Sequence, residues 1–373
     1  MTGALDGLTI VDFSRVLAGP YATMLLGDLG ADVIKVEAPT GDDTRAWGPP
    51  FDASGTATYF AGVNRNKTAV SLDLRAPDGL SAARGLVARA DVVVENFRAG
   101  AMARLGLGPE TLRRDRPDLV YCAITGFGSG SALPGYDLLV QAVGGLMSIT
   151  GPGPGQPTKV GVALVDVVTG LHASVGILAA LRHRDRTGEG QVVEVNLLSS
   201  LLSALTNQAA GYLGAGAVPG PMGNRHPSIA PYEVFATADR PLALAVGNDR
   251  QFAALATVLG VPGLATDERF RTNTDRVAHR AALFDTITAA LAGRGAEAWF
   301  EALTAAGVPA GPINDVADAF ALATRLGLEP AVAVPGAVAP GVANPIRLSA
   351  TPATYRLPPP PSPVRAQRRE SGL

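Results

Sequence analysis

The chain of 373 residues contains a single cysteine, Cys122, and carries a formal net charge of only −2. One cysteine excludes an internal disulfide and is typical of a reducing compartment, so we expect a cytoplasmic protein. The small net charge supplies no basic field that would attract nucleic acid. The N-terminal segment lacks the basic region and apolar core of a signal peptide, and no run of eighteen apolar residues predicts a membrane-spanning helix.

Several familiar catalytic and cofactor motifs are also missing. Gly126 and Gly128 begin a dinucleotide-binding pattern, but Ser131 stands where its third glycine would be. Neither a Walker motif, nor HExxH, nor GxSxG occurs. The four histidines form no metal-ligand spacing with the cysteine. A nicotinamide-dependent dehydrogenase is therefore disfavoured, and we expect no metal site and no tightly bound cofactor.

Hydrophobic residues make up 47% of the chain, and 44 glycines and 29 prolines punctuate it. This composition supports a large core interrupted by many turns. The length exceeds that of one ordinary core and predicts two domains. A Gly- and Pro-rich stretch at 214–231 indicates a boundary. We predict a large domain over residues 1–213, a smaller α/β domain over 214–320, and a return to the large domain with a tail over 321–373.

The first half alternates buried strands with helices. Strands are predicted at 8–13, 31–37, 69–72, 91–95, 119–124 and 192–195, with helices at 20–29, 77–90, 109–115 and 197–213. Such alternation favours an α/β fold with a Rossmann-like parallel sheet. The second half predicts strands at 232–237 and 242–246 and helices at 249–259, 274–291, 296–306 and 316–326. The Pro- and Arg-rich end, 351–373, is typical of a surface tail or a strap.

The stretch KVGVALVDVVTGLHASVG, residues 159–176, places a carboxylate among apolar residues. Val167, Leu171, Ser174 and Leu178 recur at helical spacing, so Asp166 lies at or near a helix start. Asp is a good N-cap, which is the simpler interpretation. A helix N-terminus would also keep a reactive carboxylate ionised, so a catalytic role is compatible with the cap.

Seven stretches occur in an order that resembles one enzyme family. They are LTIVDFSRVLAGPYATMLLGDLGADVIKVEAP near the start, NRNKTAVSLDL, VVENFRAGAMARLGL, ITGFG, PGYD, the Asp166 stretch and GEGQVVEVNLL. Together they resemble the family III CoA-transferases, whose fold alpha-methylacyl-CoA racemases share. The resemblance covers about residues 6–320. It implies a Rossmann-like large domain, a small domain and an interlocked homodimer.

The resemblance also implies a reaction and its residues. An aspartate, Asp166 by motif position, attacks an acyl-CoA thioester, and the reaction passes through a mixed anhydride and an aspartyl-CoA thioester to a carboxylic acid acceptor. A positioned, partly desolvated carboxylate is a competent nucleophile. The residues that would contact coenzyme A are Arg15, Val16, Leu72, Arg75, Asn96, Phe97, Arg98 and Arg104. Substrate-side candidates are Leu17, Trp47, Tyr59, Arg225 and His226.

Tyr136 bears on the choice between transferase and racemase. Racemases resemble this chain at the aspartate but carry a histidine base at the position of Tyr136. A tyrosine of ordinary pKa is a poor base at neutral pH and a reasonable hydrogen-bond donor, so a transferase is favoured. Leu17 and the absence of a glycine run after residue 223 depart from formyl-CoA transferases, which makes oxalate a doubtful acceptor. The alternatives are a racemase and a CoA-binding protein without catalysis.

Overall fold

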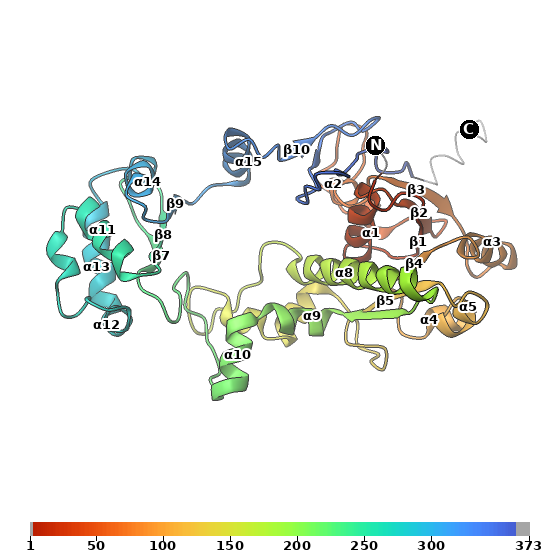
Figure 1. Ribbon diagram of the computed structural model, residues 1–373, viewed down its shortest axis with the longest axis horizontal. Helices are drawn as coiled ribbons and strands as arrows, with labels where there is room; N and C mark the ends of the chain where they lie inside the picture. The colour runs from red at the N-terminus through yellow and green to blue at the C-terminus, as the bar shows by residue number, and fades with distance from the viewer. Residues whose placement is uncertain (1–2, 363–373) are drawn as a thin grey trace. The chain divides into compact units, whose positions relative to one another are not determined.

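A computed structural model of the chain describes residues 3–362. The described chain divides into two compact units (Figure 1), each treated by itself below. The first comprises residues 3–147, 159–218 and 328–362, and the second 148–158 and 219–327. The chain therefore also enters the second unit briefly before Asp166, an excursion that the sequence-based boundaries at 214 and 320 do not include.

The first unit is built on a six-stranded sheet. Its strands are β1 (Thr9–Asp12), β2 (Asp32–Glu37), β3 (Lys67–Ser71), β4 (Val92–Glu95), β5 (Val120–Thr125) and β6 (Val192–Asn196). They pair in the order β3-β2-β1-β4-β5-β6, and every pair is parallel. The predicted parallel sheet is thus confirmed, and its order is that of a doubly wound α/β sheet.

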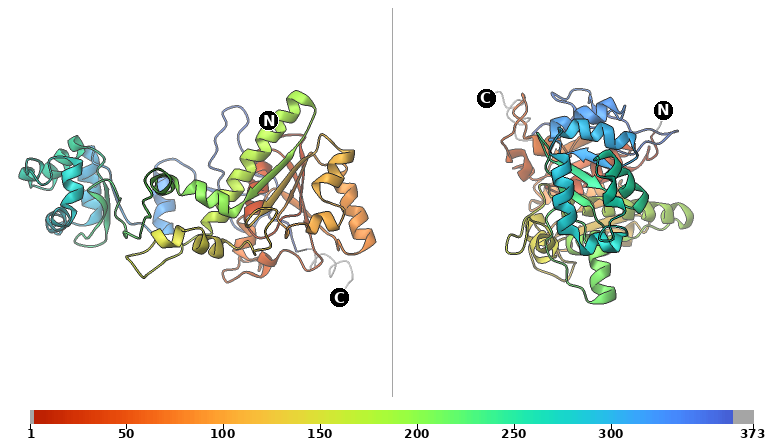
Figure 2. Two further views of the ribbon diagram at one scale, coloured as in Figure 1. Left: turned by 90° about the horizontal axis from the view of Figure 1, so that it is seen from below. Right: turned by 90° about the vertical axis from the view of Figure 1, so that its left-hand side faces the viewer.

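Helices cover both faces of this sheet, as Figure 2 shows. The helices α1 (Ala18–Asp28), α8 (Leu164–Thr187) and α9 (Leu197–Ala204) bury one face through a core that includes Ile10, Val94 and Ile177. The opposite face packs against α3 (Pro77–Val87), α4 (Ala101–Arg104) and α5 (Pro109–Asp115). Strands covered on both faces explain the nearly continuous apolar runs of the sequence.

Helix α8 crosses α1 at close range. A Cβ on Gly170 would lie 2.6 Å from the carbonyl oxygen of Ala18, so only glycine allows this approach. Among the described residues, α8 alone is long and apolar enough to span a membrane, and 44% of its most apolar window is buried within the chain. The expectation of no membrane-spanning helix rested on the absence of an unbroken run of eighteen apolar residues, and it stays a prediction.

One predicted helix of the first unit needs correction, and the burial of another can now be described. The stretch predicted as one helix over 197–213 forms α9 and α10 (Thr206–Ala215), because Thr206 has a φ of 41° and breaks the helical path. On α8, Leu171 and Leu178 are exposed, whereas the buried face is formed by Thr169, Ala173 and Ile177 among others. Apolar residues therefore occupy both sides of α8.

Short elements and an extended segment complete the first unit. They are η1 (Asp43–Ala46), α2 (Thr58–Ala61), α6 (Asp137–Val143), β10 (Ala331–Val332) and β11 (Gly341–Val342). The short helix α7 (Leu146–Ile149) lies where the chain passes from the first unit to the second. Residues 351–362 have no regular structure and lie along the first unit, where the amide of Thr354 donates to the Asp28 carbonyl and Asn66 to that of Leu357. This part of the tail is a strap on its own chain; residues 363–373 lie outside the described residues.

The second unit holds a small antiparallel sheet with helices. Its strands β7 (Tyr232–Phe235), β8 (Leu242–Ala245) and β9 (Ala310–Pro312) pair in that order. The helical elements are α11 (Asp249–Val258), η2 (Pro262–Ala265), α12 (Asn273–Ala278), α13 (Arg280–Leu291), α14 (Ala296–Ala305) and α15 (Val316–Arg325). The predicted helix 274–291 is two helices separated at His279, and strand β9 was not predicted.

Candidate active site

The sheet order reverses between β1 and β4, and the chain after each of these strands carries predicted CoA-binding residues. In open α/β sheets, ligands bind outside the carboxyl ends of the strands at such a switch point. Arg15 follows β1 and Asn96 follows β4. The backbone amide of Arg15 donates to Asn96 Oδ1 at 2.9 Å, and Asn96 Nδ2 donates to the Arg15 carbonyl at 2.7 Å. This reciprocal pair fixes both turns across the switch point.

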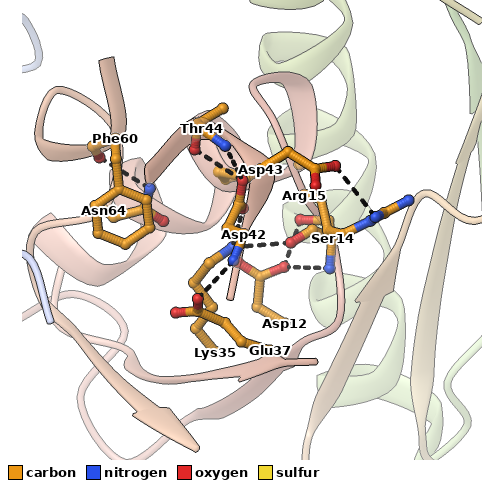
Figure 3. Close-up of polar contacts among 12 residues, drawn as sticks. Asp12, Ser14, Arg15, Lys35, Glu37, Asp42, Asp43, Thr44, Phe60 and Asn64 are labelled. Carbon is orange, nitrogen blue, oxygen red and sulfur yellow. Dashed lines mark hydrogen bonds and ion pairs between the residues drawn. The ribbon is translucent and has the colours of Figure 1, made fainter. Parts of the chain in front are cut away.

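In the turn after β1, side chains form hydrogen bonds with the backbone amide and carbonyl groups of two successive residues, Ser14 and Arg15. The Ser14 amide donates to Asp12 Oδ1 at 2.9 Å, and Lys35 Nζ donates to the Ser14 carbonyl at 2.9 Å (Figure 3). Asn96 satisfies both groups of Arg15. Val16 follows with a φ of 69°, a left-handed conformation that is unfavourable for a β-branched residue. The turn is therefore a strained backbone fixed by its surroundings.

The other predicted CoA-binding residues gather near the same edge of the sheet. The Arg15 guanidinium lies 5.7 Å from the centre of the Phe97 ring. Leu72 directly follows β3 and packs in the core beside α3. Arg75, Arg98 and Arg104 are exposed. Arg75 follows β3, Arg98 follows β4, and Arg104 lies on α4 in the connection after β4. They offer cations to solvent at the carboxyl side of the sheet, as binding of phosphate groups requires.

Asp166 lies in the first turn of α8, two residues after the helix begins at Leu164. The N-cap position belongs to Ala163, which provides no side-chain cap, so the N-cap interpretation of Asp166 is wrong. Instead Asp137 Oδ1 accepts the backbone amides of Val165 at 2.8 Å and Asp166 at 3.3 Å. A carboxylate from another element thus satisfies the helix start, which leaves the Asp166 side chain available for chemistry.

Burial raises the pKa of Asp166 to about 7, and the neighbouring charge of Asp137 adds to the increase. The expectation that the helix terminus would keep this carboxylate fully ionised is therefore not met. Loss of hydration and a second carboxylate outweigh the favourable helix end. The ionised, nucleophilic form is therefore less favoured at neutral pH than in an ordinary aspartate.

Aromatic and aliphatic side chains pack close to this carboxylate. Leu17, Val16, Tyr59 and Val167 belong to one apolar cluster. The rings of Trp47 and Tyr59 lie 5.3 Å apart in an edge-to-face arrangement. Burial raises the pKa of Tyr59 to about 12, with further contributions from the charges of Asp166, Asp137 and Asp42. Tyr59 is accordingly a neutral hydroxyl donor beside Asp166.

Tyr136 immediately precedes α6 and is 62% exposed. Its loop is held to the end of β5 by two glycines, since a Cβ on Gly126 would lie 2.5 Å from the Cα of Gly135. Gln141 extends the connection: its Nε2 donates to Asp137 Oδ2 at 2.6 Å, and its Oε1 accepts the Val160 amide at 2.9 Å. The Tyr136 loop and the segment that leads into α8 are thereby joined.

Arg225 and His226 belong to the second unit. Arg225 is exposed, and its Nε donates to the Met222 carbonyl at 3.1 Å. His226 Nδ1 accepts the Ser228 amide at 3.1 Å, and its ring lies 5.2 Å from that of Tyr232. Both are ordered by local contacts, and their role toward a substrate stays a prediction.

Two functional neighbours of the site were not predicted from the sequence. Asp137 lies within the PGYD motif, where its position next to Tyr136 was the available signal. Lys35 lies within DVIKVE, where a strand lysine would ordinarily face solvent. Within residues 3–362, no group of three or more histidine, cysteine or acidic side chains is placed to hold a metal ion.

Comparison with known proteins gives a consistent family. The family model described as CoA-transferase family III matches residues 5–363. The succinate–glutarate CoA-transferase of Agrobacterium fabrum is 45% identical over 95% of this chain and 92% of its own. The succinyl-CoA:glutarate CoA-transferase of Mus musculus is 44% identical over 86% of this chain and 74% of its own. The crystal structure of a CAIB/BAIF family protein from Brucella suis superimposes with a TM-score of 0.88 at 44% identity, covering 99% and 100% of the two chains.

Proposed function

Because the chain belongs to the family III CoA-transferases, we propose that it moves coenzyme A from succinyl-CoA to a second dicarboxylic acid of about the length of glutarate. The names of its relatives, succinate–glutarate and succinyl-CoA:glutarate CoA-transferase, support this pair of acids. In this proposal the acyl-CoA is a substrate, and no tightly bound cofactor takes part. The reaction would take place in the cytoplasm, as the single cysteine favours.

In the proposed mechanism, an Asp166 carboxylate oxygen attacks the thioester carbonyl of succinyl-CoA, the C–S bond breaks, and CoA thiolate leaves. The thiolate then attacks the Asp166 carbonyl of the resulting anhydride, which releases succinate and forms an aspartyl-CoA thioester. The acceptor carboxylate attacks this thioester and again displaces thiolate, which finally attacks the acceptor's acyl carbon. Asp166 returns as a free carboxylate, and no net proton is consumed.

One observation carries the assignment of Asp166: its carboxyl group is largely buried at a helix start, beside the hydroxyl-bearing ring of Tyr59. Tyr59, whose pKa is raised to about 12 by burial, remains protonated and can donate to an oxyanion. Tyr136, joined to the α8 start through Asp137 and Gln141, is proposed as a second donor. Trp47 and Leu17 would line the acyl side of the site.

Coenzyme A itself is proposed to bind at the switch point between β1 and β4. Arg15, Val16, Asn96 and Phe97 would contact it there, with Leu72 in contact with its apolar part. The exposed guanidinium groups of Arg75, Arg98 and Arg104 would meet its phosphates. Arg225 and His226 are proposed to meet the free carboxylate of the acid being activated.

The test is to trap the covalent intermediate on the whole protein. After incubation with succinyl-CoA, hydroxylamine or borohydride treatment should change the mass of the peptide that carries Asp166, and Asp166→Ala should lack the change. Full transferase activity in Asp166→Ala would overturn the mechanism. Wash-in of deuterium at the alpha carbon of a 2-methylacyl-CoA, without transfer to any acid, would show a racemase instead. Binding of coenzyme A without turnover of any thioester would show a non-catalytic protein.

A further inference from the structure

A fully buried ionic network lies behind the CoA-binding turn (Figure 3). It contains two carboxylates and two ammonium groups, those of Asp12, Asp42, Lys35 and Lys67, and none of these side chains is exposed to more than 3%. Lys35 Nζ pairs with Asp42 Oδ2 at 2.9 Å, and Lys67 Nζ with Asp12 Oδ2 at 3.2 Å. Although burial opposes ionisation, Lys67 and Lys35 hold the pKa of Asp12 below its usual value. The four charges balance, as burial of ions requires.

The two lysines have different neighbours. Lys67 Nζ also donates to the Pro20 carbonyl at 2.9 Å and to Asn64 Oδ1 at 3.0 Å, so its contacts fix α1 and the segment before β3. Lys35 Nζ instead donates to the carbonyl of Ser14, within the turn after β1. Only the second lysine is bonded to a backbone group of the strained turn that precedes Val16.

Through Asp42, Lys35 also reaches a second segment of the site. Asp42 Oδ1 accepts the Thr44 amide at 3.0 Å and so caps η1, which leads directly to Trp47. An exposed pair between Arg15 and Asp43, at 3.3 Å, joins the same two segments at the surface. Since surface pairs contribute little, the buried ammonium is the stronger link between the CoA-binding turn and the segment that carries the acyl-side aromatic ring.

We propose that Lys35 is a positioning residue for coenzyme A: by bridging the Ser14 carbonyl and the Asp42 carboxylate, it holds the left-handed turn at Val16 in the conformation that receives the ligand. This rests on the proposed function, since the turn must be a CoA site. Without the ammonium, the Ser14 carbonyl loses its donor and the strained turn relaxes toward more populated backbone conformations. The free-energy cost of ordering the turn then arises when coenzyme A binds, which weakens the affinity for coenzyme A.

The matched variants are Lys35→Met and Lys67→Met. Each removes one buried ammonium from the same network, so both should lower the melting temperature. Only Lys35→Met should weaken binding of coenzyme A, with a Kd at least tenfold higher by isothermal titration calorimetry and a smaller change in kcat. Lys67→Met should keep its Kd within about threefold of the wild type. Equal weakening by both would reduce the role of Lys35 to general stability and overturn the proposal.

A third variant, Lys35→Met with Asp42→Asn, separates the effect of an unpaired buried charge from the loss of the hydrogen bond to the Ser14 carbonyl. It leaves no unpaired buried charge, so it should fold and regain stability, and it covers the case in which Lys35→Met alone does not fold. The Ser14 carbonyl still lacks its donor, so the Kd should stay raised. Recovery of wild-type affinity in the double variant would overturn the proposal. Failure of wild-type protein to bind coenzyme A or to transfer it would instead contradict the proposed function.

Discussion

Asp137 accepts the backbone amide of Asp166 at 3.3 Å, together with that of Val165 at 2.8 Å. One carboxylate therefore positions the helix turn that carries the other. The same proximity places a negative charge beside Asp166 and, with burial as the larger cause, raises its pKa to about 7. Position and ionisation of the proposed nucleophile are thus coupled through a single neighbour.

Asp137→Asn separates these two effects. The amide oxygen can still accept the two backbone amides, while the charge and the hydrogen bond from Gln141 Nε2 are removed. The pKa of Asp166 should therefore fall. The acidic limb of the kcat/KM profile, expected near pH 7 in the wild type, should move about 0.5–1 pH unit lower. Asp315→Asn is the control, because Asp315 is the N-cap residue of α15 in the second unit and its side chain accepts the Asp318 amide. An unmoved limb in Asp137→Asn would contradict the coupling.

Asp166→Asn should remove activity and raise stability together. Loss of the nucleophile should lower kcat by about a thousandfold or more. Because the folded-state pKa of Asp166 lies above its unfolded value, the ionised carboxylate costs stability as pH rises toward about 7. The amide avoids that cost, so the variant should melt at a higher temperature than wild type at pH 8, with little difference at pH 4. Asp166→Glu, which keeps the charge, should gain no such stability. A rise in melting temperature equal to that of Asp166→Asn would contradict this explanation.

Much of this arrangement was predictable from the sequence, and the reasons are physical. Strands such as β1 and β5 are covered on both faces and form short apolar runs with clear ends, so the parallel sheet could be predicted. The residues proposed to contact coenzyme A were assigned from the family resemblance, and the position of Asn96 directly after β4 supports the assignment. Local sequence and the order of elements suffice for the sheet.

Contacts between distant parts of the chain were not predictable. The cap of α8 comes from Asp137, whose partner amides lie 28 and 29 residues further along. Lys35 occupies a strand position at which a lysine is usually solvated, and only the three-dimensional placement of Ser14 and Asp42 explains its burial. The strain at Val16 leaves no trace in residue type, since valine does not favour a left-handed backbone.

Glu95, at the end of β4, should make stability depend on pH. Burial raises the pKa of Glu95 to about 7, although the Phe97 amide donates to its Oε2 at 2.8 Å. The folded state therefore holds a proton that the unfolded state has lost, so this group's contribution to stability falls as pH rises from about 4.5 to about 7. Glu95→Gln should be more stable than wild type at pH 8 by up to about 3 kcal/mol, and equal to it at pH 4. Urea unfolding at the two pH values measures this; a difference at pH 4 as large as at pH 8 would contradict it.

Arg225→Ala should weaken the interaction with the acid substrate and leave the binding of coenzyme A unchanged. If Arg225 meets the free carboxylate of the substrate, the KM for glutarate should rise about tenfold, as for loss of one charge-assisted hydrogen bond. The Kd for coenzyme A alone, which lacks that carboxylate, should not change. Arg240→Ala is the control, since Arg240 is an arginine of the same unit that pairs with Glu297 and Asp318. Unchanged kinetics with glutarate would remove Arg225 from the site.

The exposed apolar side chains of α8 give the last prediction. Leu171, Val175 and Leu178 lie on the side of the helix away from its buried face, and Val175 is 65% exposed. Leu138 and Val143 on α6 and Leu202 on α9 are exposed as well, and both helices pack beside α8. Water-exposed leucine and valine in this number favour burial by a second copy of the chain, as the family resemblance implies.

Val175→Glu combined with Leu171→Glu should therefore disrupt a homodimer. Charged side chains cannot be buried in an apolar contact without partners, so the variant should elute and sediment as a monomer while the wild type behaves as a dimer. Val338→Glu, at an exposed valine in the 328–362 segment, is the control and should leave the assembly unchanged. A wild type that sediments as a monomer at micromolar concentration would show that the apolar side of α8 is not covered by a second copy.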